Sequence, residues 1–284
     1  MPSRTLLLTS LAMLAFAGNS ILCRAALRGS GIDPASFTAL RLLAGAIVLG
    51  ALLYLRGKPA KLPGSWYGAL ALFVYAAAFS FAYLHLDAGA GALLLFGAVQ
   101  LSMTAWGLFI GERLHPMQSG GIVLAGTGLL VLLLPGANTP SLSASLLMLL
   151  AGSAWGVYSL LGRGVPNPLE ATAGNFIRAL PFAALLCLMA MSGLDWELNG
   201  VVYALLSGGL ASGIGYAIWY AALPGLAATQ AASVQLSVPL LTALSGSLLL
   251  GETLTLRLLS AGVAILGGIA LVLRFKHRTA GRGR

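Results

Sequence analysis

Charged residues are scarce in this sequence, and their scarcity excludes a soluble domain. Only 8% of the 284 residues are charged, whereas 58% are hydrophobic, and the mean hydropathy is +0.93. Soluble domains carry about 25% charged residues, so this chain cannot cover a water-facing surface of ordinary size. The composition therefore fits a protein whose solvent is the lipid bilayer.

Acidic residues are rarer still, and none lies in the middle of an apolar stretch. All seven lie at or near the ends of such stretches: Asp33, Asp87, Glu112, Glu170, Asp195, Glu197 and Glu252. Metal sites and proton relays inside a membrane normally need an acid or a His there, and no spacing typical of a zinc site is present. The sequence also has no phosphate-binding loop, so we expect no metal, no cofactor and no ATP-driven step.

Cysteines are few, and basic residues are distributed unevenly. Cys23 and Cys187 both fall inside apolar stretches, so no disulfide framework is implied. The formal net charge of +9 would suit nucleic acid, but most basic residues lie in breaks on the side of the two termini: Arg4, Arg56, Lys58, Lys61, Arg113, Arg163, Arg274, Lys276, Arg278, Arg282 and Arg284. The opposite side holds Arg24, Arg28 and Arg257. This asymmetry predicts cytoplasmic termini in the inner membrane, with lipid rather than nucleic acid around the chain.

Ten stretches of about 20 mostly apolar residues, each long enough to span a bilayer, alternate with short polar breaks. Their expected bounds are 5–27, 34–55, 65–85, 89–110, 116–134, 142–162, 169–192, 199–221, 227–250 and 257–275. The first stretch follows Arg4 and could pass for a signal peptide, but the repeat described next predicts that it is retained. The fold class is therefore an all-α, polytopic membrane protein.

The two halves of the chain match each other at an offset of 137–140 residues. Matching positions in the first half are Ala15, Phe16, Ser20, Leu22, Arg24, Arg41, Phe79, Tyr83, Gly111, Glu112 and Leu114. Their partners are Ala154, Trp155, Ser159, Leu161, Arg163, Arg178, Tyr216, Tyr220, Gly251, Glu252 and Leu254. Each repeat has five helices, an odd number, so the second must enter from the opposite side. We expect one repeat over 1–137 and an inverted one over 138–284.

Three features together resemble a known family over the whole chain. They are the five-plus-five helices, the Gly-Glu pairs at 111–112 and 251–252, and an arginine early in the second helix. This pattern resembles the EamA-type members of the drug/metabolite transporter superfamily, and within it the YddG-like exporters of aromatic and other neutral amino acids. The resemblance implies a small-molecule substrate and export by alternating access. Small four-helix members couple efflux to protons through a carboxylate in the first helix, but the first helix here has no acid.

Polar and aromatic residues at symmetric positions are the candidates for the transport pathway. Phe16 and Asn19 share one helical face, and a mid-membrane Asn needs a partner or a wet cavity. Aromatic rings with polar tips suit amphipathic solutes. We expect these residues to bind substrate: Asn19, Tyr75, Phe79, Tyr83, Gln100, Trp155, Tyr158, Tyr216, Trp219, Tyr220 and Gln235. The alternatives are plain packing, an aromatic belt at the interface, or a hydrogen bond from Asn19 that ties two helices.

Other residues are expected to shape the fold. Arg41 and Arg178 could bind a substrate carboxylate or brace carbonyls at a helix end, and we expect bracing because long arginines usually snorkel. Glu112 and Glu252 follow helix C-termini, where a basic partner or a turn amide should hold them. Pro239 interrupts its helix and could be a hinge or a static kink. Small residues in the fifth and tenth stretches predict close packing or a dimer face, in a monomer or weak homodimer.

Three rival functions are open at this point. One is export of drugs or cationic compounds instead of amino acids. A second is an intramembrane enzyme, for which Ser212 is the nearest candidate nucleophile, although no His lies in the middle of a span. A third is a structural or sensor protein, which would not need an inverted repeat. For a transporter without a mid-span acid, we expect movement down the solute's own gradient without coupling to protons.

Overall fold

The computed structural model describes residues 3–57, 63–111, 113–134, 140–163, 165–226 and 228–280. Glu112 and the expected repeat boundary at 137/138 lie outside these residues. The elements are α1 (Ser3–Gly29), α2 (Pro34–Leu55), α3 (Trp66–Tyr83), α4 (Ala88–Phe109), α5 (Pro116–Leu133), α6 (Leu142–Leu161), α7 (Pro168–Met189), η1 (Met191–Gly193), α8 (Leu198–Leu205), η2 (Leu206–Ile214), α9 (Gly215–Ala222), η3 (Leu223–Gly225), α10 (Ala228–Gln235), α11 (Ser237–Leu250) and α12 (Leu256–Ala280). Within the described ranges, ten helical spans are long and apolar enough to cross a membrane. This confirms the predicted fold class.

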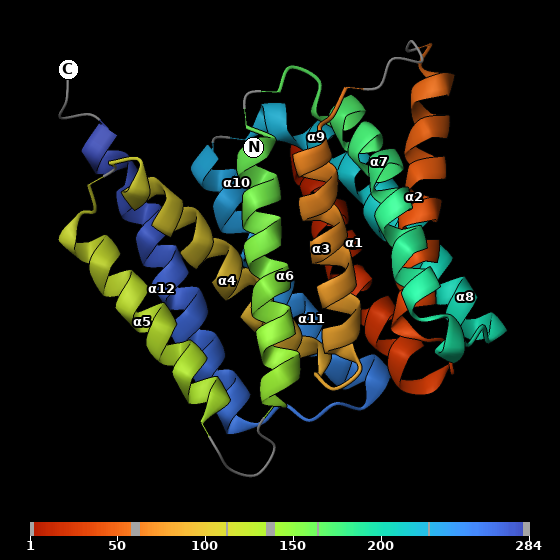
Figure 1. Cartoon of the computed structure of the whole chain (residues 1–284). Helices are drawn as coiled ribbons and strands as arrows, with labels where there is room; N and C mark the ends of the chain where they lie inside the picture. The colour runs from red at the N-terminus through yellow and green to blue at the C-terminus, as the bar shows by residue number, and fades with distance from the viewer. Residues whose placement is uncertain are drawn as a thin grey trace.

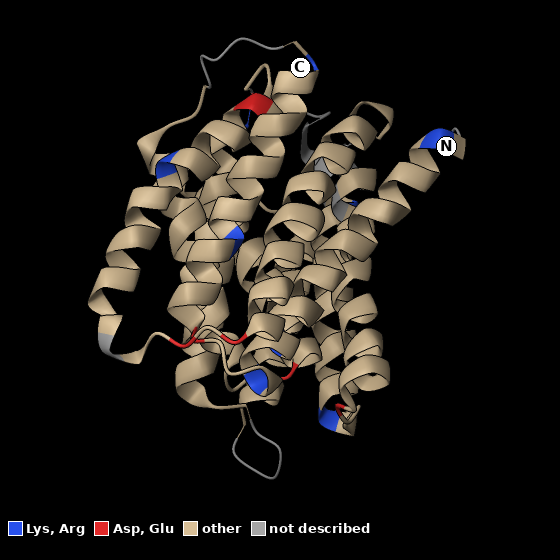
Figure 2. Ribbon diagram, turned by 90° about the vertical axis from the view of Figure 1, so that its right-hand side faces the viewer, with Lys and Arg blue, Asp and Glu red and all other residues tan. Residues whose placement is uncertain are grey.

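Acidic and hydroxyl side chains in the polar breaks start the helices. Asp33 accepts hydrogen bonds from the amides of Ala35 and Ser36, both at 2.9 Å, at the first turn of α2. Ser65 does the same for Gly68 in α3. The acidic segments gather mainly at the end of the molecule opposite the termini, as Figure 2 shows. There they meet the positive ends of helix dipoles.

The two halves of the chain pack against each other through corresponding helices. The start of α1 and the end of α12 lie at the same end of the molecule, whereas α5 ends and α6 begins at the other end (Figure 1). The second five spans therefore run in the inverted sense. α6 packs on α3 and α4, and α1 makes the corresponding contacts with η2, α9 and α11. α2 pairs with α7, and α5 pairs with α12. The contacts thus repeat the symmetry seen in the sequence, and the first helix of each half lies at the centre.

Small residues allow the closest helix contacts, including the α5–α12 pair. A Cβ on Gly121 would lie 2.6 Å from the carbonyl oxygen of Gly268, so both backbones approach without side chains between them. A Cβ on Gly152 in α6 would lie 2.5 Å from the carbonyl oxygen of Leu95 in α4. Such close approach is the usual role of small residues in membrane helices. Gly121, Gly128 and Gly268 thus serve contacts within the molecule, whereas a Cβ on Gly120, Gly126 or Gly267 would meet nothing within 4 Å.

The third and fourth spans of the second half are interrupted, unlike α3 and α4. The span expected as one helix over 199–221 contains a nine-residue π-helical segment, η2, between α8 and α9. α10 and α11 are separate helices that meet at Leu236. Pro239 has no N–H for the carbonyl of Gln235, which explains the break. Wide turns and breaks of this kind often mark functional regions. The break at Pro239 is present, and its use as a hinge stays a prediction.

Candidate functional site

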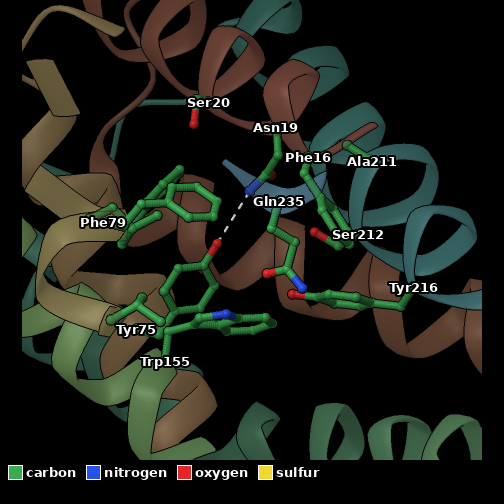
Figure 3. A pocket seen from close by; sticks show the side chains of 13 residues that line it. Phe16, Asn19, Ser20, Tyr75, Phe79, Trp155, Ala211, Ser212, Tyr216 and Gln235 are labelled. Carbon is green, nitrogen blue, oxygen red and sulfur yellow. Dashed lines mark hydrogen bonds between the residues drawn. The ribbon is translucent and has the colours of Figure 1, made fainter. Parts of the chain in front are cut away.

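A cavity of about 50 Å³ lies between the two halves, near the middle of the spans. Its walls come from both repeats, and Figure 3 shows the side chains around it. They are Phe16, Asn19, Ser20, Tyr75, Phe79, Leu95, Phe96, Val99, Trp155, Ala211, Ser212, Tyr216 and Gln235. One ordered water occupies roughly 10–15 Å³ by this measure, so a few waters fit. A metabolite needs more room than this cavity offers.

A hydrogen-bonded chain crosses one wall of the cavity and joins three elements. The hydroxyl of Ser207 in η2 donates to Oδ1 of Asn19 in α1 at 2.6 Å. The Nδ2 of Asn19 donates to the phenol oxygen of Tyr75 in α3 at 3.3 Å. All three bonded groups are buried, so each polar atom depends on the others for partners. These two hydrogen bonds link α1 to α3 of the first half and to η2 of the second half.

Aromatic rings form the rest of the wall. Trp155 of α6 stacks on Tyr216 of α9, with ring centroids 5.6 Å apart and planes 14° apart. The ring centroids of Trp155 and Tyr75 are 4.9 Å apart, and those of Phe16 and Tyr216 are 5.8 Å apart. Figure 3 shows these rings facing the amide of Gln235. The wall thus offers ring faces and neutral polar groups, which suit an ammonium group and an apolar side chain together.

The structure brings together six of the residues expected to bind substrate. Those that line the cavity are Asn19, Tyr75, Phe79, Trp155, Tyr216 and Gln235. The others lie outside it: Tyr83, Gln100, Tyr158, Trp219 and Tyr220. Trp219 packs behind Phe16, with ring centroids 6.1 Å apart, and half-buried Gln100 is one turn before Thr104, which bonds its carbonyl. Tyr83 is the last residue of α3. Tyr158 and Tyr220 lie toward the other end of the molecule, where both are bonded to Thr172.

An ionic cluster around the buried side chain of Arg24 lies toward the end opposite the termini, with Glu252 buried and Asp87 half exposed. Arg24 of α1 donates to Oε1 of Glu252 at 3.1 Å and to Oδ1 of Asp87 at 3.0 Å. It also donates to the carbonyl oxygen of Tyr83 at 2.8 Å. Glu252 accepts a 2.8 Å bond from the amide of Ala88. Glu252 thus has both kinds of partner considered from the sequence, a basic side chain and a turn amide. Burial raises the pKa of its carboxyl, against the lowering effect of the Ala88 amide and of Arg24.

A hydroxyl cluster lies toward the end at which α1 begins, between α6, α7 and α9. Thr172 of α7 accepts a hydrogen bond from Tyr158 of α6 at 3.3 Å, and it lies 3.1 Å from the phenol oxygen of Tyr220 of α9. Tyr83 and Tyr220 occupy matching positions in the two repeats. Tyr83 belongs to the Arg24 cluster and Tyr220 to the Thr172 cluster. The repeat symmetry therefore identified both residues, but neither lines the cavity.

The two symmetric arginines have different surroundings. Arg178 donates to the carbonyl oxygens of Gly174 at 3.0 Å and Pro63 at 3.5 Å, as a bracing residue would. For Arg41 we expected the same role, but it forms no hydrogen bond to a carbonyl among the described residues. Its guanidinium lies over the rings of Tyr75 and Phe79 instead. Arg41 lies two turns inside α2 and is buried, so it cannot snorkel to the surface.

Sequence reasoning missed several functional positions. Ser207, Arg24 and Thr172 were not selected, although a mid-span Ser, a symmetric Arg and a helix-start Thr are visible in the sequence. Ser212 lines the cavity, as a nucleophile would. Among the described residues that line the cavity there is no His, Asp or Glu.

Comparison with known proteins agrees with this architecture. A model of the EamA-like transporter family matches residues 3–134 and again residues 142–274. An uncharacterized protein of Pseudomonas aeruginosa is 64% identical over 95% of this chain and 94% of its own length. The threonine/homoserine exporter RhtA of Escherichia coli is 29% identical over 85% of this chain and 83% of its own. A probable amino-acid metabolite efflux pump of Salmonella typhimurium is 29% identical over 69% of this chain and 71% of its own.

A solved structure supports the fold. A crystal structure that is 22% identical in sequence superposes with a TM-score of 0.66 and covers 96% of this chain and 98% of the other. The family model accounts for both five-helix halves separately, which fits the inverted repeat seen in the contacts. From the repeated match and the shared architecture it follows that this multi-pass membrane protein belongs to the EamA-like transporter family.

Proposed function

We propose that the protein exports small metabolites, amino acids first among them, across the inner membrane by alternating access. The observation that carries the proposal is the position of the cavity. It lies between two inverted repeats, with the Arg24 cluster toward one end of the molecule and the Thr172 cluster toward the other. Opening one end while the other stays closed would expose the site to one side at a time.

Amino acids suit the lining of the cavity. Ring faces of Trp155 and Tyr216 attract an ammonium group, and the amides of Asn19 and Gln235 supply neutral donors and acceptors. The names of two relatives, an amino-acid metabolite efflux pump and a threonine/homoserine exporter, support the same substrate class. The family resemblance seen in the sequence adds aromatic amino acids to the candidates.

Movement down the solute's own gradient is the expected energetics. All seven acids lie at span ends in the sequence, and the described lining of the cavity has no titratable carboxylate or imidazole. Proton coupling needs a group that changes charge while it faces each side in turn. For a metabolite made in excess inside the cell, passive exit is sufficient for export.

Purified protein in liposomes tests this proposal. Liposomes loaded with unlabelled threonine, homoserine or phenylalanine should take up the labelled amino acid by counterflow, and an imposed pH step should not change the uptake. Counterflow of none of these amino acids would refute the proposed substrate class. Accumulation of a zwitterionic amino acid driven by a pH step alone would refute the uncoupled mechanism.

Export of drugs or cationic compounds is the second candidate, because an aromatic wall also binds organic cations. Uptake of a quaternary ammonium dye by the same liposomes, without amino-acid counterflow, would favour it.

We also propose cytoplasmic termini, because the basic residues are distributed asymmetrically. A tag at the C-terminus should then stay inaccessible in intact cells. A tag there that reacts with an impermeant reagent would refute this orientation.

A further inference from the structure

Arg41 is a buried positive charge for which the described part of the chain offers no counterion. Its exposed fraction is 2%. Its Nη1 atom is fully buried and has no hydrogen-bond partner among the described residues. Among the described residues no carboxylate forms an ion pair with it. A cation taken out of water normally keeps an anion or several acceptors around it, so this site has an unmet preference for negative charge.

Two aromatic rings hold the guanidinium of Arg41 beside the cavity. Its Cζ lies 4.9 Å from the ring centroid of Phe79 and 5.2 Å from that of Tyr75. Both rings also line the cavity. The charge is therefore one ring away from the space in which a solute would bind. Cation–π contact stabilises the charged form but supplies no acceptor for the buried N–H group.

The backbone of Arg41 is held firmly in place. Its carbonyl oxygen packs directly on Gly208 of η2, where no Cβ would fit. On the next turn of α2, Gly45 lies against Phe176 and the carbonyl oxygen of Gly208. The π-helical segment and α2 thus meet at this arginine without side chains between them. The contact fixes the start of the Arg41 side chain relative to the cavity wall.

Among the described residues, no acid pairs with Arg41. Acidic residues lie only at the span ends in the sequence. The acids nearest to α2 and α1 already have partners. Asp33 accepts the amides that begin α2, and Asp87 and Glu252 hold Arg24. An anion at Arg41 therefore comes from outside the described part of the protein, and the carboxylate of a bound solute can supply it.

We propose that Arg41 binds the carboxylate of the transported amino acid. This inference rests on the proposed function and names the part of the substrate that the site selects. A turn of the Phe79 or Tyr75 side chain brings the guanidinium to the cavity, where its planar fork matches a carboxylate. The ammonium group then faces Trp155 and Tyr216 across the cavity. A zwitterion fits both sides, whereas an organic cation meets the charge of Arg41 and is repelled.

The symmetric arginine supplies a matched control. Arg178 occupies the corresponding position in the second repeat but bonds the carbonyls of Gly174 and Pro63. Arg178→Gln removes the same charge from an equivalent helix without touching the lining of the cavity. Arg41→Gln removes the proposed carboxylate partner, and Arg41→Lys keeps the charge but loses the planar fork.

The test compares each amino acid with its amide, which keeps the side chain and the ammonium group but lacks the carboxylate. Liposomes are loaded with threonine or phenylalanine, and competition by the acid and by the amide is measured. We expect wild type to bind the acid about 10- to 100-fold more tightly than the amide, the range of a charge-assisted hydrogen bond. Arg41→Gln should lose that preference, Arg41→Lys should keep part of it, and Arg178→Gln should keep it.

Each outcome decides the inference. Equal binding of acid and amide by wild type overturns it, even if Arg41→Gln fails to fold, because that comparison needs no variant. Full preference for the acid in Arg41→Gln also overturns it and leaves the proposed function intact. Failure of wild type to exchange either amino acid refutes the proposed function, and the inference falls with it. Loss of the preference in Arg41→Gln alone supports it.

Discussion

Replacing Ser207 with alanine removes the hydroxyl that donates to Asn19 across the wall of the cavity. The bond is 2.6 Å long and wholly buried, and it joins residues 188 positions apart in the chain. Its loss leaves Oδ1 of Asn19 without that donor. Hydrogen bonds between membrane helices average about 0.6 kcal/mol and reach about 1.7 kcal/mol. Given its length and burial, we expect Ser207→Ala to lower the free energy of unfolding by about 1–2 kcal/mol.

Ser80→Ala is the matched control for this change. Ser80 is as fully buried as Ser207, but its hydroxyl donates to the carbonyl of Ala76 in its own helix at 2.9 Å. The bond that its removal takes from another element is one with the thiol of Cys23 in α1, which is a weak donor and acceptor. The control should therefore cost less stability than Ser207→Ala, although both remove one buried hydroxyl.

A double-mutant cycle separates the bond from other effects of the substitutions. Apparent unfolding free energies of wild type, Ser207→Ala, Asn19→Ala and the double variant are measured in detergent micelles. We expect a coupling energy of about 0.5–2 kcal/mol between the two residues. A coupling energy of zero, or a Ser80→Ala variant as unstable as Ser207→Ala, would show that the chain of hydrogen bonds does not tie η2 to α1.

Two further substitutions test the cavity wall and the Arg24 cluster. Trp155→Leu removes the ring that stacks on Tyr216 and should lower counterflow by about two- to tenfold, since aromatic contacts contribute about 0.5–1.5 kcal/mol beyond burial. Trp196→Leu changes an exposed ring and should leave counterflow unchanged; equal effects of the two substitutions would contradict the assignment. Glu252→Ala leaves Arg24 with Asp87 as its one acidic partner and should lower stability by about 1–3 kcal/mol, measured by thermal unfolding in detergent; an unchanged melting temperature would contradict a stabilising role for the cluster.

The ten spans and their inverted order could be predicted because they depend on local properties. Length and hydropathy of each stretch decide whether it can span a bilayer, and an odd number of spans per repeat decides the inversion. Asn19, Trp155 and Tyr216 were found for a related reason. A polar or amphipathic residue deep in a span is costly to leave in lipid, and its symmetric position in the repeat marks a central helix.

Partners far apart in the sequence could not be predicted. Arg24 and Glu252 are 228 residues apart, and only the packing of α1 beside α11 brings them together. The π-helical segment was also missed. Glycines at 208, 209 and 213 make such a segment easy to form. Its packing against α2 decides where along the span it forms.

The two symmetric arginines show most clearly where sequence information ends. Arg41 and Arg178 have the same side chain at matching positions, so the sequence predicts one role for both. In the folded protein, Arg178 lies beside the carbonyls of Gly174 and Pro63. Arg41 lies against aromatic rings of another helix, and no described residue accepts a hydrogen bond from its Nη1. The sequence placed both charges inside the membrane, and tertiary packing decided their roles, because the partners of a buried charge are the groups that neighbouring helices bring to it.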